Sequence, residues 1–272
     1  MRAAFQNLHT HTTYCDGAQT VEEMIKTAIQ KGGGSIGFSE HSYVSFDADY
    51  SIRIEDIPKY INEINVLKKK YADRIEVFLG MEVDYFAENV PDGLDYIIGS
   101  AHHVEKNQVY IAVDGAFKHL EDMNDVHFCG DYLAMAELYF LTLADVVDKT
   151  RADIIGHFDL IAKHNINGKM FDEMHPRYVK AALRAMDEIL EKCKVFEVST
   201  GAMYRLGKTV PYPSVYLLKE LCKRGGEVLL TSDSHNADSL YYKFDEMSEL
   251  VKACGFKYIK RLTKNGFIDE KL

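Results

Sequence analysis

Residues 77–81 read Val-Phe-Leu-Gly-Met, and the acidic residue Glu82 follows them directly. A short, wholly apolar run of this kind predicts a β-strand that is buried on both faces, as in parallel sheets covered by helices. A carboxylate at the end of such a strand lies where parallel α/β proteins place their functional side chains. The stretch therefore predicts an α/β fold with a functional site at the carboxyl ends of its strands.

The rest of the chain repeats this strand pattern, with amphipathic stretches between the strands. Such alternation predicts βα units and a largely parallel sheet, here an α/β barrel in a single domain over residues 1–272. Residues 104–130 fit the alternation least well, and we expect an elaborated loop or short hairpin there. Strands are predicted at about 5–9, 35–38, 75–80, 96–99, 153–156, 195–198 and 227–230. Helices are predicted at about 21–31, 57–71, 132–149, 176–192, 214–223 and 244–253.

Composition and charge restrict the classes of partner. Of the 272 residues 47% are hydrophobic and 27% are charged, which is typical of a globular protein with a sizeable core. No apolar stretch is long enough for a membrane span or a signal peptide, so we expect no membrane partner and a cytoplasmic location. The formal net charge of −10 argues against nucleic acid, whose phosphate backbone requires a basic surface. A small phosphorylated substrate stays possible, since bound cations can reverse the local field.

Potential metal ligands collect at one rim of the predicted barrel, because six of the seven predicted strands end near a histidine, aspartate or glutamate. Two of these ligands, His9 and His11, are two residues apart, so both rings project from the same face of an extended chain. Imidazole and carboxylate ligands together suit zinc, iron(II) or manganese(II). Glu82 is the candidate to bridge two ions. The candidate ligands are His9, His11, His41, Glu82, His102, His157, Asp233 and His235.

These residues stand in motifs that resemble those of the polymerase-and-histidinol-phosphatase (PHP) family. The resemblance spans residues 9–235, nearly the whole chain, and the combination of motifs is highly specific. Residues 196–205 and 211–214 are similar to the histidinol-phosphate phosphatase branch of that family. The matching motifs are His9-Thr10-His11, Asp16-Gly17, Ser39-Glu40-His41, Gly80-Met81-Glu82, Gly99-Ser100-Ala101-His102, Gly156-His157-Phe158-Asp159 and Ser232-Asp233-Ser234-His235.

The resemblance implies a distorted, TIM-like (β/α)7 barrel that holds two or three divalent ions of zinc, manganese or iron. The second metal position would share Glu82 with the first, and the third would depend on Asp16, a position where relatives can carry histidine. Glu40 and Asp159 are candidates to orient neighbouring imidazoles, although Glu40 could equally cap a helix. The implied ligand sets are His9, His11, Glu82 and Asp233 for the first metal, His102 and His157 with Glu82 for the second, and Asp16, His41 and His235 for the third.

The implied reaction is hydrolysis of L-histidinol phosphate to L-histidinol and phosphate, a step of histidine biosynthesis. A hydroxide that bridges the first two ions would attack phosphorus, with Glu82 and Asp233 holding those ions. The leaving alkoxide would be assisted by His103, by Asp16 or by a metal ion directly.

Four residues are candidates for contact with the substrate. Arg205 would grip the phosphate through its planar guanidinium, and Arg177 is a weaker candidate for the same role. His103 lies beside a predicted ligand and points the other way on an extended chain, so it faces either the substrate, a ligand or the core. Tyr204 and residues 104–130 are where we expect contacts with the imidazole and amine of the substrate.

Three other activities fit the same residues. The chain could act on a different small phosphomonoester or a nucleotide, which the metal ligands alone do not distinguish. It could be a metal-dependent amidohydrolase, which would have little need for Arg205. It could also bind metal without catalysis, although a complete ligand set argues against this.

Overall fold

Seven parallel strands form the centre of the molecule, in a computed structural model that describes residues 5–272. The strands are neighbours in space in the order in which they follow in the sequence. A parallel bridge between Thr10 and Ser234 joins the two edges, so the sheet nearly closes into a barrel. This confirms the predicted TIM-like barrel. The strands are β1 (Gln6–Asn7), β2 (Ser35–Phe38), β3 (Glu76–Asp84), β4 (Tyr96–Ser100), β7 (Ile154–Ile155), β8 (Val195–Ser199) and β9 (Glu227–Thr231).

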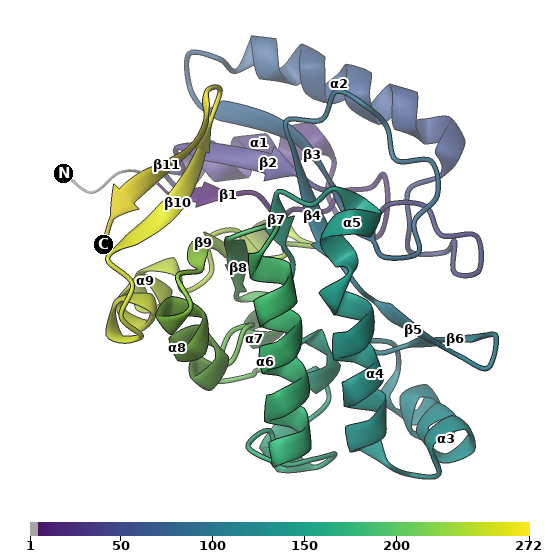
Figure 1. Cartoon of the computed structure of the whole chain (residues 1–272). Helices are drawn as coiled ribbons and strands as arrows, with labels where there is room; N and C mark the ends of the chain where they lie inside the picture. Colours follow the sequence, from purple (N-terminus) through teal and green to yellow (C-terminus); the bar gives the residue numbers. More distant parts are fainter. Residues whose placement is uncertain (1–4) are drawn as a thin grey trace.

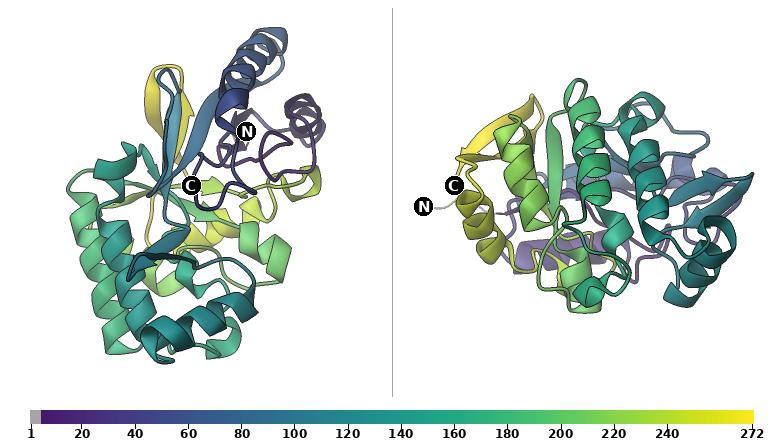
Figure 2. Two further views of the ribbon diagram at one scale, coloured as in Figure 1. Left: turned by 90° about the vertical axis from the view of Figure 1, so that its right-hand side faces the viewer. Right: turned by 60° about the horizontal axis from the view of Figure 1, so that its bottom comes forward.

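Helices cover the outside of the barrel, as the alternating pattern predicts. Figure 1 shows α4 beside α6 on one side and α2 along the other, and Figure 2 shows the same layers from two further directions. Thr20 caps the first helix, and Glu23 completes its capping box. The helices are α1 (Val21–Gln30), α2 (Ile57–Lys70), α3 (Phe117–Phe128), α4 (Tyr132–Ala144), α5 (Val146–Thr150), α6 (Pro176–Leu190), α7 (Gly201–Leu206), α8 (Val215–Lys223) and α9 (Phe244–Ala253).

The inside of the barrel is filled by side chains around Tyr96, which is 1% exposed. Its hydroxyl lies within hydrogen-bond distance of the carbonyl oxygens of Leu8, directly after β1, and of Phe38 in β2. A Cβ on Gly80 would lie 2.2 Å from the Tyr96 ring, closer than carbon atoms can approach. The glycine in the apolar stretch 77–81 therefore leaves room for the tyrosine that fills the barrel.

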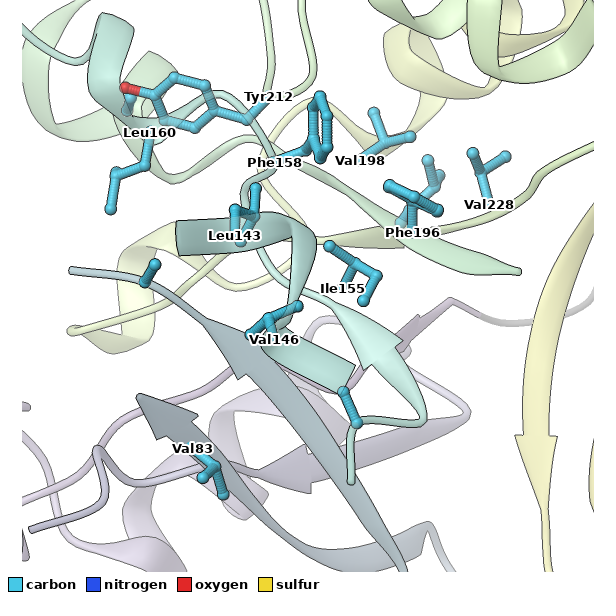
Figure 3. Packing of buried hydrophobic residues seen from close by; sticks show 14 of the residues in the cluster. Val83, Leu143, Val146, Ile155, Phe158, Leu160, Phe196, Val198, Tyr212 and Val228 are labelled. Atoms are coloured by element: carbon cyan, nitrogen blue, oxygen red, sulfur yellow. The ribbon is translucent and has the colours of Figure 1, made fainter. Parts of the chain in front are cut away.

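A larger apolar layer lies between the strands and the helices. Figure 3 shows part of it, where Val146 and Leu143 of the helical segments lie near Ile155 and the aromatic ring of Phe158. Because this layer and the barrel interior both exclude water, the strands are buried on both faces, as the apolar run at residues 77–81 predicts.

Three predicted regions differ from the observed elements by more than two residues at an end, and the short helix α7 was not predicted. Strand β3 continues to Asp84, so Glu82 lies within the strand and not after it. The predicted helix 132–149 is two helices, because the backbone leaves the helical conformation at Asp145. Residues 104–130 contain the expected hairpin, β5 (His103–Lys106) and β6 (Val109–Ala112), and in addition the unpredicted helix α3. The hairpin turns at Asn107 and Gln108, both of which have positive φ.

Residues 258–271 lie outside every predicted element and form an antiparallel hairpin, β10 (Tyr258–Thr263) and β11 (Gly266–Lys271). Leu262 from this hairpin, with Phe267 packed alongside, contacts the apolar cluster inside the barrel. Because β9 also lies beside β10, the hairpin covers the amino-terminal end of the barrel, opposite the predicted rim. Within residues 5–272 no helix has both the length and the apolar character needed to cross a membrane.

Candidate active site

A pocket of about 490 Å³ opens at the carboxyl ends of the strands, where the sequence predicts the functional rim. Its floor is made by buried side chains at strand ends, and its walls come from the loops that follow. The residues that line it are Asp16, His41, Asp47, Asp49, Tyr50, His102, His103, Ala112, Asp114, Gly115, His157, Leu160, Lys163, Arg205, Asp233 and His235.

Glu82 is buried beneath the side chains of His41, His102 and His157, which line the pocket, and it forms the lower layer of the floor together with the buried His9 and His11. One carboxylate oxygen is 2.8 Å from His157 Nε2 and 3.3 Å from His102 Nε2. The other is 3.2 Å from His9 Nε2 and 2.8 Å from His41 Nδ1. Burial alone would raise the pKa of Glu82, but the charges of these neighbours hold it well below its usual range. A buried carboxylate that faces several imidazoles from both oxygens is suited to bridge two cations.

Asp233 is the second carboxylate that several imidazoles surround, and like Glu82 it lies within 3.6 Å of His9 Nε2. Its Oδ1 atom lies 3.3 Å from His11 Nε2, 3.6 Å from His9 Nε2 and 3.5 Å from His235 Nδ1. The residue has a φ of +42°, a left-handed conformation that is uncommon for aspartate and recurs at functional sites. Burial would raise its pKa, but the charges of Arg205 and His9 hold the pKa well below its usual range.

The remaining predicted ligands meet at the mouth of the pocket. Asp16 lies 3.1 Å from His235 Nε2 and 3.7 Å from His41 Nε2. The structure thus brings all nine predicted ligands into one site. Donor atoms lie within 4.8 Å of one another in four sets that cover them: His9, His11 and Asp233; His9, Glu82 and His157; His41, Glu82 and His102; and His11, Asp16, His41 and His235.

Five side-chain nitrogen and oxygen atoms of these residues are buried and have no hydrogen-bond partner within residues 5–272. They are His9 Nε2, His11 Nε2, His41 Nδ1, Glu82 Oε2 and His157 Nδ1. Unsatisfied buried polar atoms are costly and uncommon, so several at one place indicate a group that they bind. The nitrogen and carboxylate atoms of these four sets fit a divalent transition metal. A fifth set, His11, Cys15 and Glu40, also has its ligand atoms within 4.8 Å of one another and is the one that contains a thiol among the described residues.

Two acidic residues that were not predicted, Glu197 and Asp84, lie against the imidazole rings of predicted metal ligands. Glu197 in β8 accepts hydrogen bonds at 2.7 Å from His9 Nδ1 and at 2.6 Å from the backbone nitrogen of His157. Asp84 lies 3.1 Å from His102 Nδ1. Such carboxylate–imidazole pairs fix the ring and leave the other nitrogen for the metal. Their signal in the sequence is a single acid within an otherwise apolar strand, as in residues 195–199.

Glu40 and Asp159, the two residues predicted to orient imidazoles, have other hydrogen-bond partners in the structure. Glu40 accepts no hydrogen bond from His41 and caps no helix; its carboxylate binds Thr12 and Cys15 instead. Asp159 accepts from the backbone nitrogen of Ser214 at 2.9 Å and does not contact the His157 ring. Both predictions were wrong because adjacency in sequence does not determine which side chains face each other across the barrel.

The four predicted substrate contacts separate into two pairs. Arg205 in α7 donates to Asp233 Oδ2 at 2.6 Å and lines the pocket. His103 also lines it and lies 3.0 Å from Asp47.

The other pair lies elsewhere. Arg177 forms ion pairs with Glu137 and Asp131 on the outer surface, where α4 meets α6, so the structure does not bring it to the pocket. Tyr204 packs edge-on against Tyr242 at 5.2 Å between ring centroids and is not among the residues that line the pocket.

The walls of the pocket carry several acidic side chains, two of which are paired with basic groups: Asp114 with Lys163 and Asp47 with His103. Asp47, Asp49 and Tyr50 come from the loop after β2, and Asp114 follows the hairpin β5–β6. Burial would raise the pKa of Asp114, but the charge of Lys163 lowers it to about 2, so it is ionised at neutral pH. Residues 104–130 therefore contribute to the pocket as expected, and residues 47–50 contribute without having been predicted.

Known proteins resemble this chain in sequence and in structure. The "Probable histidinol-phosphatase" of Schizosaccharomyces pombe is 27% identical over 94% of this chain and 89% of its own length. The "Histidinol-phosphatase" of Bacillus subtilis is 24% identical over 89% of this chain and 97% of its own. The crystal structure of a histidinol phosphate phosphatase from Lactococcus lactis, complexed with zinc, L-histidinol and phosphate, has a TM-score of 0.75 at 21% identity and covers 98% of this chain and 99% of its own.

The family model described as "PHP domain" matches residues 7–201, which include the ligands from His9 to His157. The match covers well over half of the chain, and it confirms the resemblance that the motifs indicate. The strand order, the rim of imidazoles and carboxylates, and this match agree, and the chain belongs to the PHP domain family.

Proposed function

We propose that this chain hydrolyses L-histidinol phosphate to L-histidinol and inorganic phosphate, as a metal-dependent phosphatase of histidine biosynthesis. The observation that carries the proposal is the pocket itself, in which Arg205 and several acidic side chains lie around a cluster of imidazoles and carboxylates. Five relatives named as histidinol-phosphatases or probable ones align over about nine-tenths of both chains, which supports the choice of substrate.

The floor of the pocket would hold two or three divalent ions of zinc, manganese or iron(II). Glu82 would be shared between His9, His11 and Asp233 on one side and His102 and His157 on the other, and Asp16, His41 and His235 would form a third position. Ions bound there would neutralise charge on the phosphoryl group and make water a stronger nucleophile near neutral pH.

Arg205 would bind the phosphate. Its guanidinium is held by the Asp233 side chain at 2.6 Å and by the Asp233 carbonyl oxygen at 3.2 Å, which directs it over the pocket floor. A planar guanidinium presents five N–H donors, so these contacts leave donors for phosphoryl oxygens. The arginine is thus positioned both to orient the phosphate and to offset the charge that develops on it.

The acidic wall would bind the other end of the substrate. L-Histidinol carries an amine and an imidazole, both of which are cationic or hydrogen-bond donors near neutral pH. Asp47, Asp49 and Asp114 line the pocket with carboxylates, of which Asp114 is paired with Lys163 at 3.2 Å and Asp47 with His103 at 3.0 Å. A sugar phosphate or nucleotide offers no such cation, so this wall favours a phosphomonoester whose leaving group is basic. His103, held by Asp47, lies between the floor and this wall.

The test is phosphate release from L-histidinol phosphate compared with nucleotides, sugar phosphates and an aryl phosphate, after loading with manganese, iron(II) or zinc separately. We expect a kcat/KM for histidinol phosphate that exceeds the others by about 10³-fold, roughly 4 kcal/mol of transition-state discrimination. Activity that is spread evenly over the panel would retain the metal chemistry and reject the substrate. No phosphate release from any ester, with amide hydrolysis instead, would reject the reaction class.

A further inference from the structure

The loop that follows β1 carries Asp16 and is packed tightly against the residues that precede it. The backbone nitrogens of Cys15 and Gly17 both donate to the carbonyl oxygen of Thr12, at 3.1 and 2.9 Å. A Cβ on Gly17 would lie 2.5 Å from backbone atoms of His11 and Thr12, so only glycine fits this turn without displacement. The position of the loop therefore depends directly on the position of His11.

Glu40 fastens this loop from the neighbouring strand end. Its side chain is fully buried and accepts from the Thr12 hydroxyl at 2.7 Å and from the Thr12 backbone nitrogen at 3.0 Å. The thiol of Cys15 donates to the same carboxylate, at 2.7 Å between Sγ and Oε2. Glu40 is thus occupied by the loop, although it stands next to His41 in the sequence.

The sulfur of Cys15 also contacts His11, at 3.5 Å from Nδ1. A thiol has a single proton, and a carboxylate at 2.7 Å is a better acceptor for it than an imidazole nitrogen at 3.5 Å. The sulfur can then only accept from His11, which places the ring proton on Nδ1. The lone pair of Nε2 consequently faces Glu82 and Asp233, where that atom is buried without a hydrogen-bond partner within residues 5–272.

We propose that Cys15 is a positioning residue of the metal site, whose sulfur accepts a hydrogen bond from His11 Nδ1 and whose thiol proton is donated to Glu40. The thiol does for His11 what the carboxylates of Glu197 and Asp84 do for His9 and His102. Because Cys15 precedes Asp16, the same contact also holds the loop that supplies a ligand at the pocket mouth. The inference rests on metal binding within the proposed function and not on the identity of the substrate.

The experiment measures zinc affinity, by competition with a chromophoric chelator, for the full chain and for three variants. Cys15→Ala removes the sulfur, whereas Cys15→Ser keeps one acceptor and one donor at the same place. Cys222→Ala is the matched control, since Cys222 is also partly exposed and lies in α8, outside the pocket. We expect Cys15→Ala to weaken zinc binding by about 10- to 100-fold, and the other two variants to stay within about threefold of the unaltered chain.

A second measurement does not depend on any variant folding. In the zinc-loaded chain with ¹⁵N-labelled histidine, we expect the nitrogen shifts of His11 to show a protonated Nδ1. A His11 protonated on Nε2, or wild-type zinc affinity in Cys15→Ala, would overturn the inference. The inference would also be overturned if both Cys15→Ser and Cys15→Ala lost zinc affinity and His11 were protonated on Nε2. If the chain binds zinc as expected but releases no phosphate from histidinol phosphate, the proposed substrate fails and the role of Cys15 stands.

Discussion

The floor of the pocket is built from strands and strand ends, whereas its walls are built mainly from loops. His9, His11 and Glu82 belong to β3 or to strand ends and are at most 1% exposed, so each is held by packing as well as by hydrogen bonds. Asp47, from a loop in the wall, has a side chain that is 41% exposed. A buried, fixed ligand set is suited to hold charges in one geometry, whereas an exposed loop can vary with the substrate. The difference implies that the floor determines the reaction and the walls determine the substrate.

The largest expected effect follows from altering Glu82, in the lower layer of the floor. Glu82→Gln keeps the size of the side chain but removes the negative charge that faces several imidazoles. We expect kcat/KM for histidinol phosphate to fall by about 10³-fold or more, roughly 4 kcal/mol, together with loss of bound metal. Metal content by elemental analysis and steady-state kinetics measure the two effects. Full metal content with more than a tenth of the activity would show that Glu82 is not the shared ligand.

The next effect compares the two arginines that were predicted to bind phosphate, Arg205 as the stronger candidate and Arg177 as the weaker one. Arg205→Ala removes the cation over the floor, and we expect kcat/KM to fall by about 10²-fold, near 3 kcal/mol. Arg177→Ala is the control, because its guanidinium pairs with Glu137 and Asp131 outside the pocket. We expect it to change kcat/KM by less than about twofold. Equal losses in both variants would contradict the assignment of the phosphate to Arg205.

A smaller and more selective effect is expected in the wall. Asp47→Asn removes a carboxylate that is partly exposed and lies 3.0 Å from His103. We expect kcat/KM for histidinol phosphate to fall by about tenfold, while that for an aryl phosphate without a cation changes little. The ratio of the two kcat/KM values is the quantity to measure. A uniform loss on both substrates would place Asp47 with the floor and remove the distinction between floor and wall.

The smallest expected effect is on the free energy of unfolding and comes from the buried residue Asp159. Burial raises the pKa of Asp159 to about 6, so the folded state favours the protonated carboxyl. Because this pKa is raised above its unfolded value, the resulting stability is complete below about pH 4 and is lost as the pH rises toward about 6. Asp159→Asn keeps the acceptor for Ser214 but cannot ionise.

We expect Asp159→Asn to be more stable than the unaltered chain by about 1 kcal/mol at pH 7.5, and to show no advantage at pH 4. The gain is smaller than the pKa shift alone suggests, since the new amide also buries a donor that must find a partner. Urea denaturation of both metal-free proteins at the two pH values measures the difference. A constant difference at both pH values would mean that Asp159 does not titrate in this range.

Local sequence patterns predict the strands, and they predict that the candidate ligands lie close together, for a definite reason. Each strand is a short apolar run, and most of the candidate ligands lie at or soon after its carboxyl end, so both signals lie within a few residues of each other. The residues that orient the ligands were missed because their partners are far away in sequence. Glu197 binds His9 from 188 residues away, and no local pattern relates the two.

Contacts between residues that are distant in sequence also explain why the predicted role of Glu40 was wrong and why Asp47 was not predicted to line the pocket. Glu40 stands beside a ligand, yet its carboxylate turns to the loop after β1, 25 to 28 residues earlier. Asp47 lies in a polar loop that has no distinguishing composition, and it joins the pocket only because the loop meets the hairpin β5–β6 at His103. Proximity in sequence predicts neither contact.

The sequence by itself determined that this chain forms a parallel barrel whose strand ends carry imidazoles and carboxylates, because burial on both faces and ligand spacing are local properties. Only the tertiary structure decided which of these side chains share a cation position, that Arg205 and not Arg177 faces them, and that a thiol supports His11. These depend on distances between strands and loops, which closure of the barrel sets and which no single segment encodes.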